Sequence, residues 1–397
     1  NTLSNVWVVQ NSAGDTVTLT QGTGANVVIP NGGIRMVATD GAGSGAAVTD
    51  VLDVLGGTGN VGLGSGAFGT GLTTGTDNVA IGDSAGDALT SGSDNTLAGD
   101  NAGGALTTGS DNVAIGSAAL ATEDGNGKNV AVGSQALQTL NAGADSYNVG
   151  VGYQAGNDLT SGIQNTLIGG LAGDLLTDAD YNVAVGVSAL GADTKGSKSV
   201  ALGYSTLTAQ NFTTSTDTFN TAVGYQAGAA TTTGKSNVFV GAESGKVNTT
   251  GENNTFVGHE AGIANIAGSF NTAVGRDALT ANTSGTYNVA VGQDSLKANT
   301  TASNNTAAGY SALSDNDEGT ENAAFGAYAG YAVTTGDSNT AVGYASLYTA
   351  TSANANTAVG HMALKLNTTG TLNTAVGAGA AQSNETGGAI TAVGKDA

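Results

Sequence analysis

A five-residue pattern, Asn-(Thr/Val)-x-(Val/Ile/Leu)-Gly, recurs through most of this 397-residue chain with few substitutions. Twenty copies are present, and sixteen of the nineteen spacings between their closing glycines are 17 residues. The other spacings are 18, 19 and 21, and the register never slips between Gly224 and Gly394. Such a fixed period indicates a repeat architecture, whereas disordered low-complexity sequence has no reason to keep it. The closing glycines, called repeat glycines below, are Gly64, Gly82, Gly99, Gly116, Gly133, Gly152, Gly169, Gly186, Gly203, Gly224, Gly241, Gly258, Gly275, Gly292, Gly309, Gly326, Gly343, Gly360, Gly377 and Gly394.

One repeat is too short for a strand followed by a crossover helix. In the copy that ends at Gly82, Val79 and Ile81 point to one face of a strand and Ala80 to the other. We therefore predict an all-β fold, a parallel β-roll or β-solenoid of twenty coils of about 17 residues. Each strand would bond in parallel to its copy one coil later. We expect residues 84–86, which are small, to form a second strand in the coil.

Two consequences follow from stacking. The motif asparagines Asn78, Asn95 and Asn112 would form an amide ladder, each side chain bonding to the one above and below. So thin a coil also encloses little, so the Val/Ile face and the Ala face cannot both be internal. Association with identical chains would bury the second face, and we expect a parallel homotrimer.

Residues 1–55 have a different character and are predicted to form a small N-terminal β-domain that attaches or caps the shaft, which comprises residues 56–397. This segment holds the only Pro and the only Trp of the chain. Short apolar or alternating runs predict strands, and turn clusters separate them. The runs are Val6–Val9, Asp15–Thr20, Asn26–Pro30 and Ile34–Ala38, and the turn clusters include Asn11–Gly14 and Asn31–Gly33.

The shaft repeat resembles the head repeats of trimeric autotransporter adhesins (YadA-like heads). The runs that carry the resemblance are Asn220–Gly228 (NTAVGYQAG) and Asn112–Gly116 (NVAIG), and it extends over residues 60–397. It implies a left-handed parallel β-roll in which three chains interlock around one axis. The 397 residues depart from the autotransporter pattern, since they contain no signal peptide, stalk heptads or membrane anchor.

Similar repeats occur in phage tail fibres, and the first domain resembles a module common in those fibres. The run Gln21–Gly32, followed by Thr39–Gly43, carries this second resemblance. Together they favour a structural fibre protein of a phage virion that projects or mediates host-surface attachment, with other tail proteins and a host receptor or glycan as partners. A bacterial trimeric adhesin head on the cell surface is the alternative, and a polysaccharide-degrading tailspike is a third. Because the chain ends within a repeat at Lys395–Ala397, we expect a further C-terminal region.

Charge and composition exclude several functions. The chain has 31 acidic and 10 basic residues, a net charge of −21, so it repels nucleic acid phosphates. There is no cysteine, which removes disulfides, thiolate metal sites and cysteine nucleophiles. No apolar run approaches the roughly 20 residues of a membrane helix, and we expect no membrane insertion.

Stacked carboxylates are the first candidates for chemistry. Asp77, Asp94 and Asp111 precede the motif asparagine in successive repeats and would lie about 4.8 Å apart. That spacing is near the separation of a retaining glycosidase pair, and such a ladder could also bind Ca²⁺. These aspartates recur because the repeat recurs, however, and no active site is needed to explain them. Acidic turn residues of this kind keep a solenoid soluble.

Histidines and aromatic residues share one position directly after the repeat glycine. His259 and His361 are 102 residues apart and cannot share a metal within one chain. Tyr153, Tyr204, Tyr225, Tyr310 and Tyr344 occupy the same position, and Tyr147, Phe219, Phe270 and Tyr287 precede the motif asparagine. They either fill space along a stripe or form a glycan- or receptor-contact stripe. The longer coils near Asp145 and at 211–214 are further candidates. We predict no enzyme activity, and therefore no catalytic, cofactor-binding or metal-binding residue.

Overall fold

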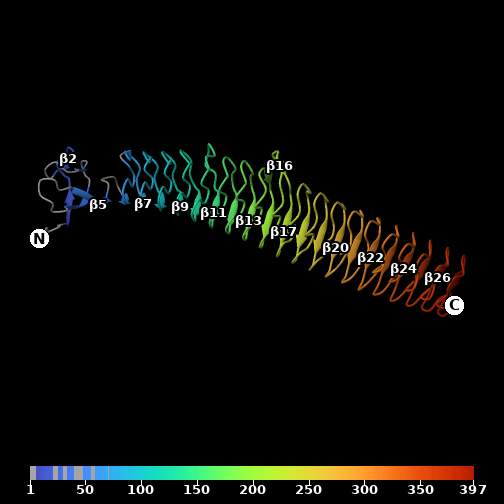
Figure 1. Cartoon of the computed structure of the whole chain (residues 1–397). Coiled ribbons are helices and arrows are strands. Elements are labelled where there is room, and N and C mark those ends of the chain that lie inside the picture. Colours follow the sequence, from blue (N-terminus) through green and yellow to red (C-terminus); the bar gives the residue numbers. More distant parts are fainter. Residues whose placement is uncertain (1–5, 21–25, 30–33, 40–47, 55–58, 70) are drawn as a thin grey trace. The chain divides into compact units, whose positions relative to one another are not determined.

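The computed structural model describes the chain except for residues 1–5, 21–25, 30–33, 40–47, 55–58 and 70. The described residues contain strands and turns but no helix, and therefore none that could cross a membrane. The predicted parallel β-solenoid is confirmed, with about twenty coils of about 17 residues. By its internal contacts the chain divides into two compact units, residues 1–182 and 183–397. In Figure 1 one short strand recurs in every coil.

The first unit begins with antiparallel strands. Strand β4 pairs with both β1 and β5, and β2 pairs with β3. Val27, Ile29 and Val37 form a small core with Val9 and Leu19. The predicted strands are confirmed, and β5 is an additional one; the turn at 31–33 and much of the run at 21–32 and 39–43 lie outside the described residues. The bounds are β1 Val6–Gln10, β2 Val17–Leu19, β3 Val27–Ile29, β4 Ile34–Thr39 and β5 Val48–Val54.

The rest of the first unit consists of parallel coils. Strand β7 pairs in register with β8, so that Ala80 lies beside Leu97. The following strands also pair in register with an offset of 17 residues, except that Val130 pairs with Val149 across one longer coil. The strands are β6 Val61–Leu63, β7 Val79–Ile81, β8 Thr96–Ala98, β9 Val113–Ile115, β10 Val130–Val132, β11 Val149–Val151 and β12 Thr166–Ile168.

The second unit contains coils of the same kind. Its strands are β13 Val183–Val185, β15 Val200–Leu202, β17 Thr221–Val223, β18 Val238–Val240, β19 Thr255–Val257, β20 Thr272–Val274, β21 Val289–Val291, β22 Thr306–Ala308, β23 Ala323–Phe325, β24 Thr340–Val342, β25 Thr357–Val359, β26 Thr374–Val376 and β27 Thr391–Val393. One longer coil adds a second parallel pairing, in which its β16 Thr216–Asp217 pairs with β14 Gly196–Ser197 of the preceding coil.

The repeat glycines set the close approach between coils. All twenty have φ between +125° and +144°, a conformation that side chains rarely adopt. A Cβ on Gly99 would lie 2.5 Å from the carbonyl oxygen of Gly116, the equivalent glycine one coil on. Any other residue would therefore have to push two coils apart.

The motif asparagines are buried and form a ladder that matches the prediction in part. Amide-to-amide bonds join Asn78 and Asn95, whereas Asn112 is linked to Oδ1 of Asn95 by its backbone N–H. Asn95 donates from Nδ2 to Oδ1 of Asn78 at 2.9 Å, and its backbone N–H donates to the same oxygen at 3.0 Å. Its Nδ2 also donates to the carbonyl of Gly109 at 2.9 Å. The ladder thus binds both the neighbouring amide and the turn backbone, which leaves few of its polar atoms without a partner.

The expected second strand at 84–86 is wrong. Ser84 and Gly86 have φ of 53° and 58°, so the chain turns there instead of running extended. The N–H of Ser84 donates to Ser65 in the preceding coil, and that of Gly86 to Ala102 in the following one. Hydrogen bonds to the coil before and the coil after thus satisfy these backbone N–H groups of the turn, without a second strand.

The central residue of the solenoid strands faces the interior, and the Val/Ile face is outside. Ala80 is fully buried, whereas Ile81 is 44% exposed. Large central residues are matched by glycine in the turn: a Cβ on Gly103 would meet Leu97 at 2.8 Å. Where the central residue of the strand is alanine, leucine usually occupies the turn position that corresponds to Gly103. The narrow interior is therefore filled by complementary sizes.

A second amide ladder lies at the inner-turn position, which is seven residues after each repeat glycine. Early coils hold leucine here, but the second unit has a run of buried asparagines from Asn248 to Asn316. Asn265 donates from Nδ2 to Oδ1 of Asn248 at 2.7 Å, and the pattern repeats along the run. Val333 follows, so Oδ1 of Asn316 has no donor. The sequence reading missed this ladder.

We expect Gly152→Ala to destabilise the solenoid by about 2 kcal/mol, since its Cβ would lie 2.5 Å from the carbonyl oxygen of Gly169 at a φ of 136°. Gly170→Ala is the matched control, because its nearest neighbour is 4.0 Å away. The control should be neutral or slightly stabilising. Chemical denaturation followed by circular dichroism measures both, and equal effects would contradict the stacking argument.

The end of the second ladder gives another prediction. Val333→Asn alone supplies a donor to Asn316 but leaves its own oxygen unpaired, so stability should not rise. The double variant Val333→Asn/Ala350→Asn joins the two ladder segments, at Asn316 and Asn367, and should gain about 1 kcal/mol over the single one. A double-mutant cycle on thermal unfolding measures the coupling; strictly additive effects would show that the ladder does not close.

Candidate functional site

Aromatic side chains gather on the turns that follow β22 to β25. Of the residues predicted from sequence, Tyr310, Tyr344 and His361 belong to this group. Tyr328, Tyr331 and Tyr348 join them from other turn positions that the sequence reading did not single out. We call this group the aromatic cluster: Tyr310, Tyr328, Tyr331, Tyr344, Tyr348 and His361.

Stacking of coils brings these rings together. Tyr331 and Tyr348 are one period apart, and their rings stack with centroids 5.2 Å apart. Tyr344 and His361 stack in the same way at 5.5 Å. Tyr328 lies between these two stacked pairs. Its ring contacts that of Tyr344 edge-to-face, with centroids 6.0 Å apart and an angle of 89° between the rings. The cluster therefore combines stacked columns with one perpendicular ring.

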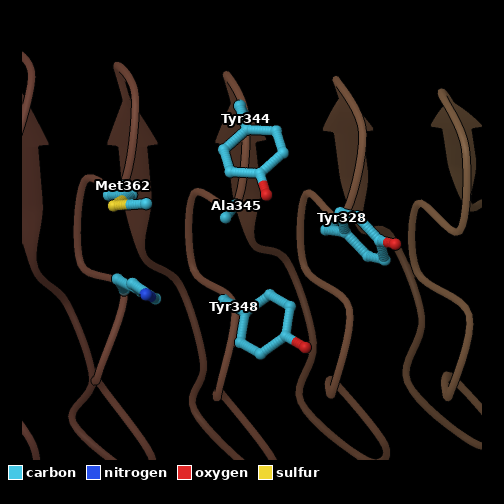
Figure 2. Close-up of a pocket in the computed structure, with 6 residues that line it drawn as sticks. Tyr328, Tyr344, Ala345, Tyr348 and Met362 are labelled. Atoms are coloured by element: carbon cyan, nitrogen blue, oxygen red, sulfur yellow. The ribbon is translucent and has the colours of Figure 1, made fainter.

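A cavity of about 340 Å³ opens beside Tyr328. Its lining consists of Tyr328, Tyr344, Ala345, Tyr348, Met362 and Lys365. Figure 2 shows Tyr344 and Tyr348 on one coil, with Tyr328 and Met362 on the coils to either side. Ala345, only 3% exposed, lies between them. Three coils thus contribute to one hollow on the outside of the solenoid.

The hydroxyl group of Tyr328 at this cavity is a neutral donor and acceptor. Loss of solvation raises the pKa of Tyr328, and the neighbouring Tyr310, Tyr344 and Tyr348 raise it further. Tyr328 therefore stays protonated at neutral pH. Lys365 is the cation in the lining, and it makes no ion pair among the described residues.

The other predicted aromatic residues are exposed, and four of them lie in stacked pairs. Tyr204 stacks on Tyr225 at 5.6 Å, and Phe270 stacks on Tyr287 at 5.0 Å. Phe219 lies under Lys198, with the ammonium 5.5 Å from the ring centre. The remaining members of the predicted set are Tyr153, which is exposed, and Tyr147, which is exposed beneath Lys128.

The two predicted histidines lie in different surroundings. His361 belongs to the aromatic cluster, whereas His259 lies near Glu260 and Asp277. Ligand atoms of these three side chains lie within 4.8 Å of one another, the only such group of three in the described part of the chain. His259 is exposed, and Asp277 also faces Arg276 at 3.5 Å. A cation here would have to compete with that arginine.

The stacked aspartates do not converge. Asp77, Asp94 and Asp111 are exposed turn residues with φ of 60° to 61°. The side chain of Asp145, in one longer coil, pairs with Lys128. In the other longer coil Phe212 is buried and its N–H donates to Asp193 at 3.0 Å. These longer coils are tied to the solenoid by their own contacts.

No protein-family model, curated protein or solved structure matches this chain.

One buried carboxyl group escaped the sequence reading. Glu123 takes the inner-turn position where neighbouring coils have leucine, and it is fully buried. Its Oε1 accepts bonds from the N–H and the side-chain amide of Asn126 at 3.1 and 2.9 Å. Loss of solvation still raises its pKa above the ordinary 4.5, and the nearby Asp124 adds to the rise.

A group with a raised carboxyl pKa makes the folded state less stable as pH rises above its unfolded value. We therefore expect Glu123→Gln to stabilise the protein at pH 7, with a gain that disappears as the pH falls below about 4.5. Thermal unfolding across pH 3.5–8 measures this. Asp124→Asn, which removes only the exposed neighbour, should have a much smaller effect; a gain for Glu123→Gln that is independent of pH would contradict the assignment.

Proposed function

We propose that this protein is a structural fibre protein of a phage virion, a tail fibre or similar appendage, that projects or mediates attachment to a host surface without catalysis. The observation that carries the proposal is a parallel solenoid whose outward strand face is apolar. The resemblance of the repeat to fibre and adhesin heads supports it, as does the acidic surface, which keeps a long repetitive protein soluble.

The strand face supports a homotrimer. Ile81, Ile115 and Val291 are 44%, 41% and 41% exposed, on strands whose inner residues are fully buried. Apolar side chains, most of them Val or Ile, recur at this outward position in paired strands, so they line up along the sheet. A row of exposed apolar side chains is typical of a protein contact, and identical chains in parallel present it with the same spacing. Left-handed coils interlocked around one axis are part of the proposal.

The antiparallel domain would join the shaft to other virion proteins. The alternative is a trimeric adhesin head on a bacterial surface, which the same repeat favours. The genes beside this one separate the two: tail genes support the fibre, and an outer-membrane anchor in the same reading frame supports the adhesin. New reducing ends after incubation with capsular polysaccharide would instead indicate a tailspike.

Solution mass tests the assembly. Light scattering of the purified chain should give three times the 38.1 kDa of one chain. Val291→Asp places a charge on the strand face and should lower the mass toward that of one chain, because burying three carboxylates is unfavourable.

Tyr287→Asp is the matched control for that experiment. The position is 58% exposed, and other coils already have aspartate there. Its mass should equal that of the unaltered chain. A monomeric unaltered chain would contradict the trimer, and a trimeric Val291→Asp variant would contradict the strand-face contact.

A further inference from the structure

We propose that the cavity beside Tyr328 binds a hexopyranose unit of a surface polysaccharide. The inference rests on the proposed attachment function and adds the ligand class and the site. It is carried by the shape of the cavity, by the chemistry of its lining and by the way in which one small residue opens it.

The cavity arises where one small residue lies between two larger ones in a column, that is, at the same position of successive coils. The second residue after the repeat glycine is Tyr328, Ala345 and Met362 in three successive coils. Ala345 forms the floor, and the side chains of its two neighbours in this column rise on either side (Figure 2). Tyr344 and Tyr348, from the same coil as Ala345, complete the wall. The hollow of about 340 Å³ is within the size range of small-ligand sites.

The lining suits a ligand with an apolar face and a polar edge. Tyrosine rings and the Met362 thioether offer polarizable surface against which the C–H face of a pyranose can pack. Phenolic hydroxyls can donate to and accept from sugar hydroxyls, and Lys365 adds a donor that pairs with no carboxylate in the described part of the chain. Stacked and edge-to-face contacts hold the rings before a ligand arrives, which lowers the entropy cost of binding.

Saturation-transfer NMR on the full chain tests the proposal, with glucose, galactose, mannose and N-acetylglucosamine as separate probes in excess. We expect transfer to the ring C–H protons of at least one sugar. Ala345→Gln should reduce it at least fivefold, because the longer side chain fills the cavity. The fold should tolerate this change, since Gln135 and Gln154 occupy the same position at the same left-handed φ.

Ala118→Gln is the matched control, at the same position in a distant coil with a φ of 55°, and should leave the transfer unchanged. Tyr348→Gln is the second variant; it removes a wall, and glutamine already occurs at this position as Gln138. It should weaken transfer without changing the circular dichroism spectrum.

Three outcomes would overturn the proposal. These are no transfer to any of the four sugars, equal transfer in Ala345→Gln and the unaltered chain, or a changed solution mass of Ala345→Gln, which would place the cavity at a contact between chains. Mass and sugar binding are measured on the same sample. A trimer that binds no sugar therefore refutes only the cavity, and a sugar-binding monomer refutes only the trimeric fibre.

Discussion

The contact between successive repeat glycines is the constraint on which the rest of the structure depends. Because a Cβ on Gly99 would collide with the carbonyl of Gly116, the two backbones approach as closely as the chain allows. Strand pairing on one side of that contact and turn hydrogen bonds on the other then fix one spacing for the whole coil. Each side chain consequently lies on its copy in the next coil, and a residue acts through its column more than through its sequence neighbours.

The stacking of equivalent side chains in columns explains both the stability and the weak points of the interior. An amide stacked on an amide satisfies its oxygen and its NH₂ group together, which is why asparagine is tolerated in a core so thin. The same rule makes any interruption costly. Asn316 ends a ladder with an unpaired oxygen, and Glu123 places a carboxyl group in a leucine column. These defects are local, because each coil contacts only its neighbours.

The period, the parallel strands and the first asparagine ladder could be predicted from sequence because they depend on backbone spacing, which a strict count reveals. The turn could not. Ser84 adopts a left-handed φ although it is not glycine, and its turn is held by hydrogen bonds from Ser84 to the preceding coil and from Gly86 to the following one. Which strand face is internal was also left open, since Ala80 and Ile81 are both apolar and only the width of the coil decides.

Only part of the aromatic cluster could be predicted from the sequence, because only part of it occupies a conspicuous position of the repeat. Tyr310 and Tyr344 share a position that the repeat makes conspicuous. Tyr331 and Tyr348 share another, at which the other coils have polar or small residues, or Ile263 in one case. Aligning every column by the period would have found them. Their meeting with Tyr328 depends on distances across the turn that no count provides. A binding site can therefore arise in a uniform scaffold by a few substitutions in adjacent columns, without any change of backbone.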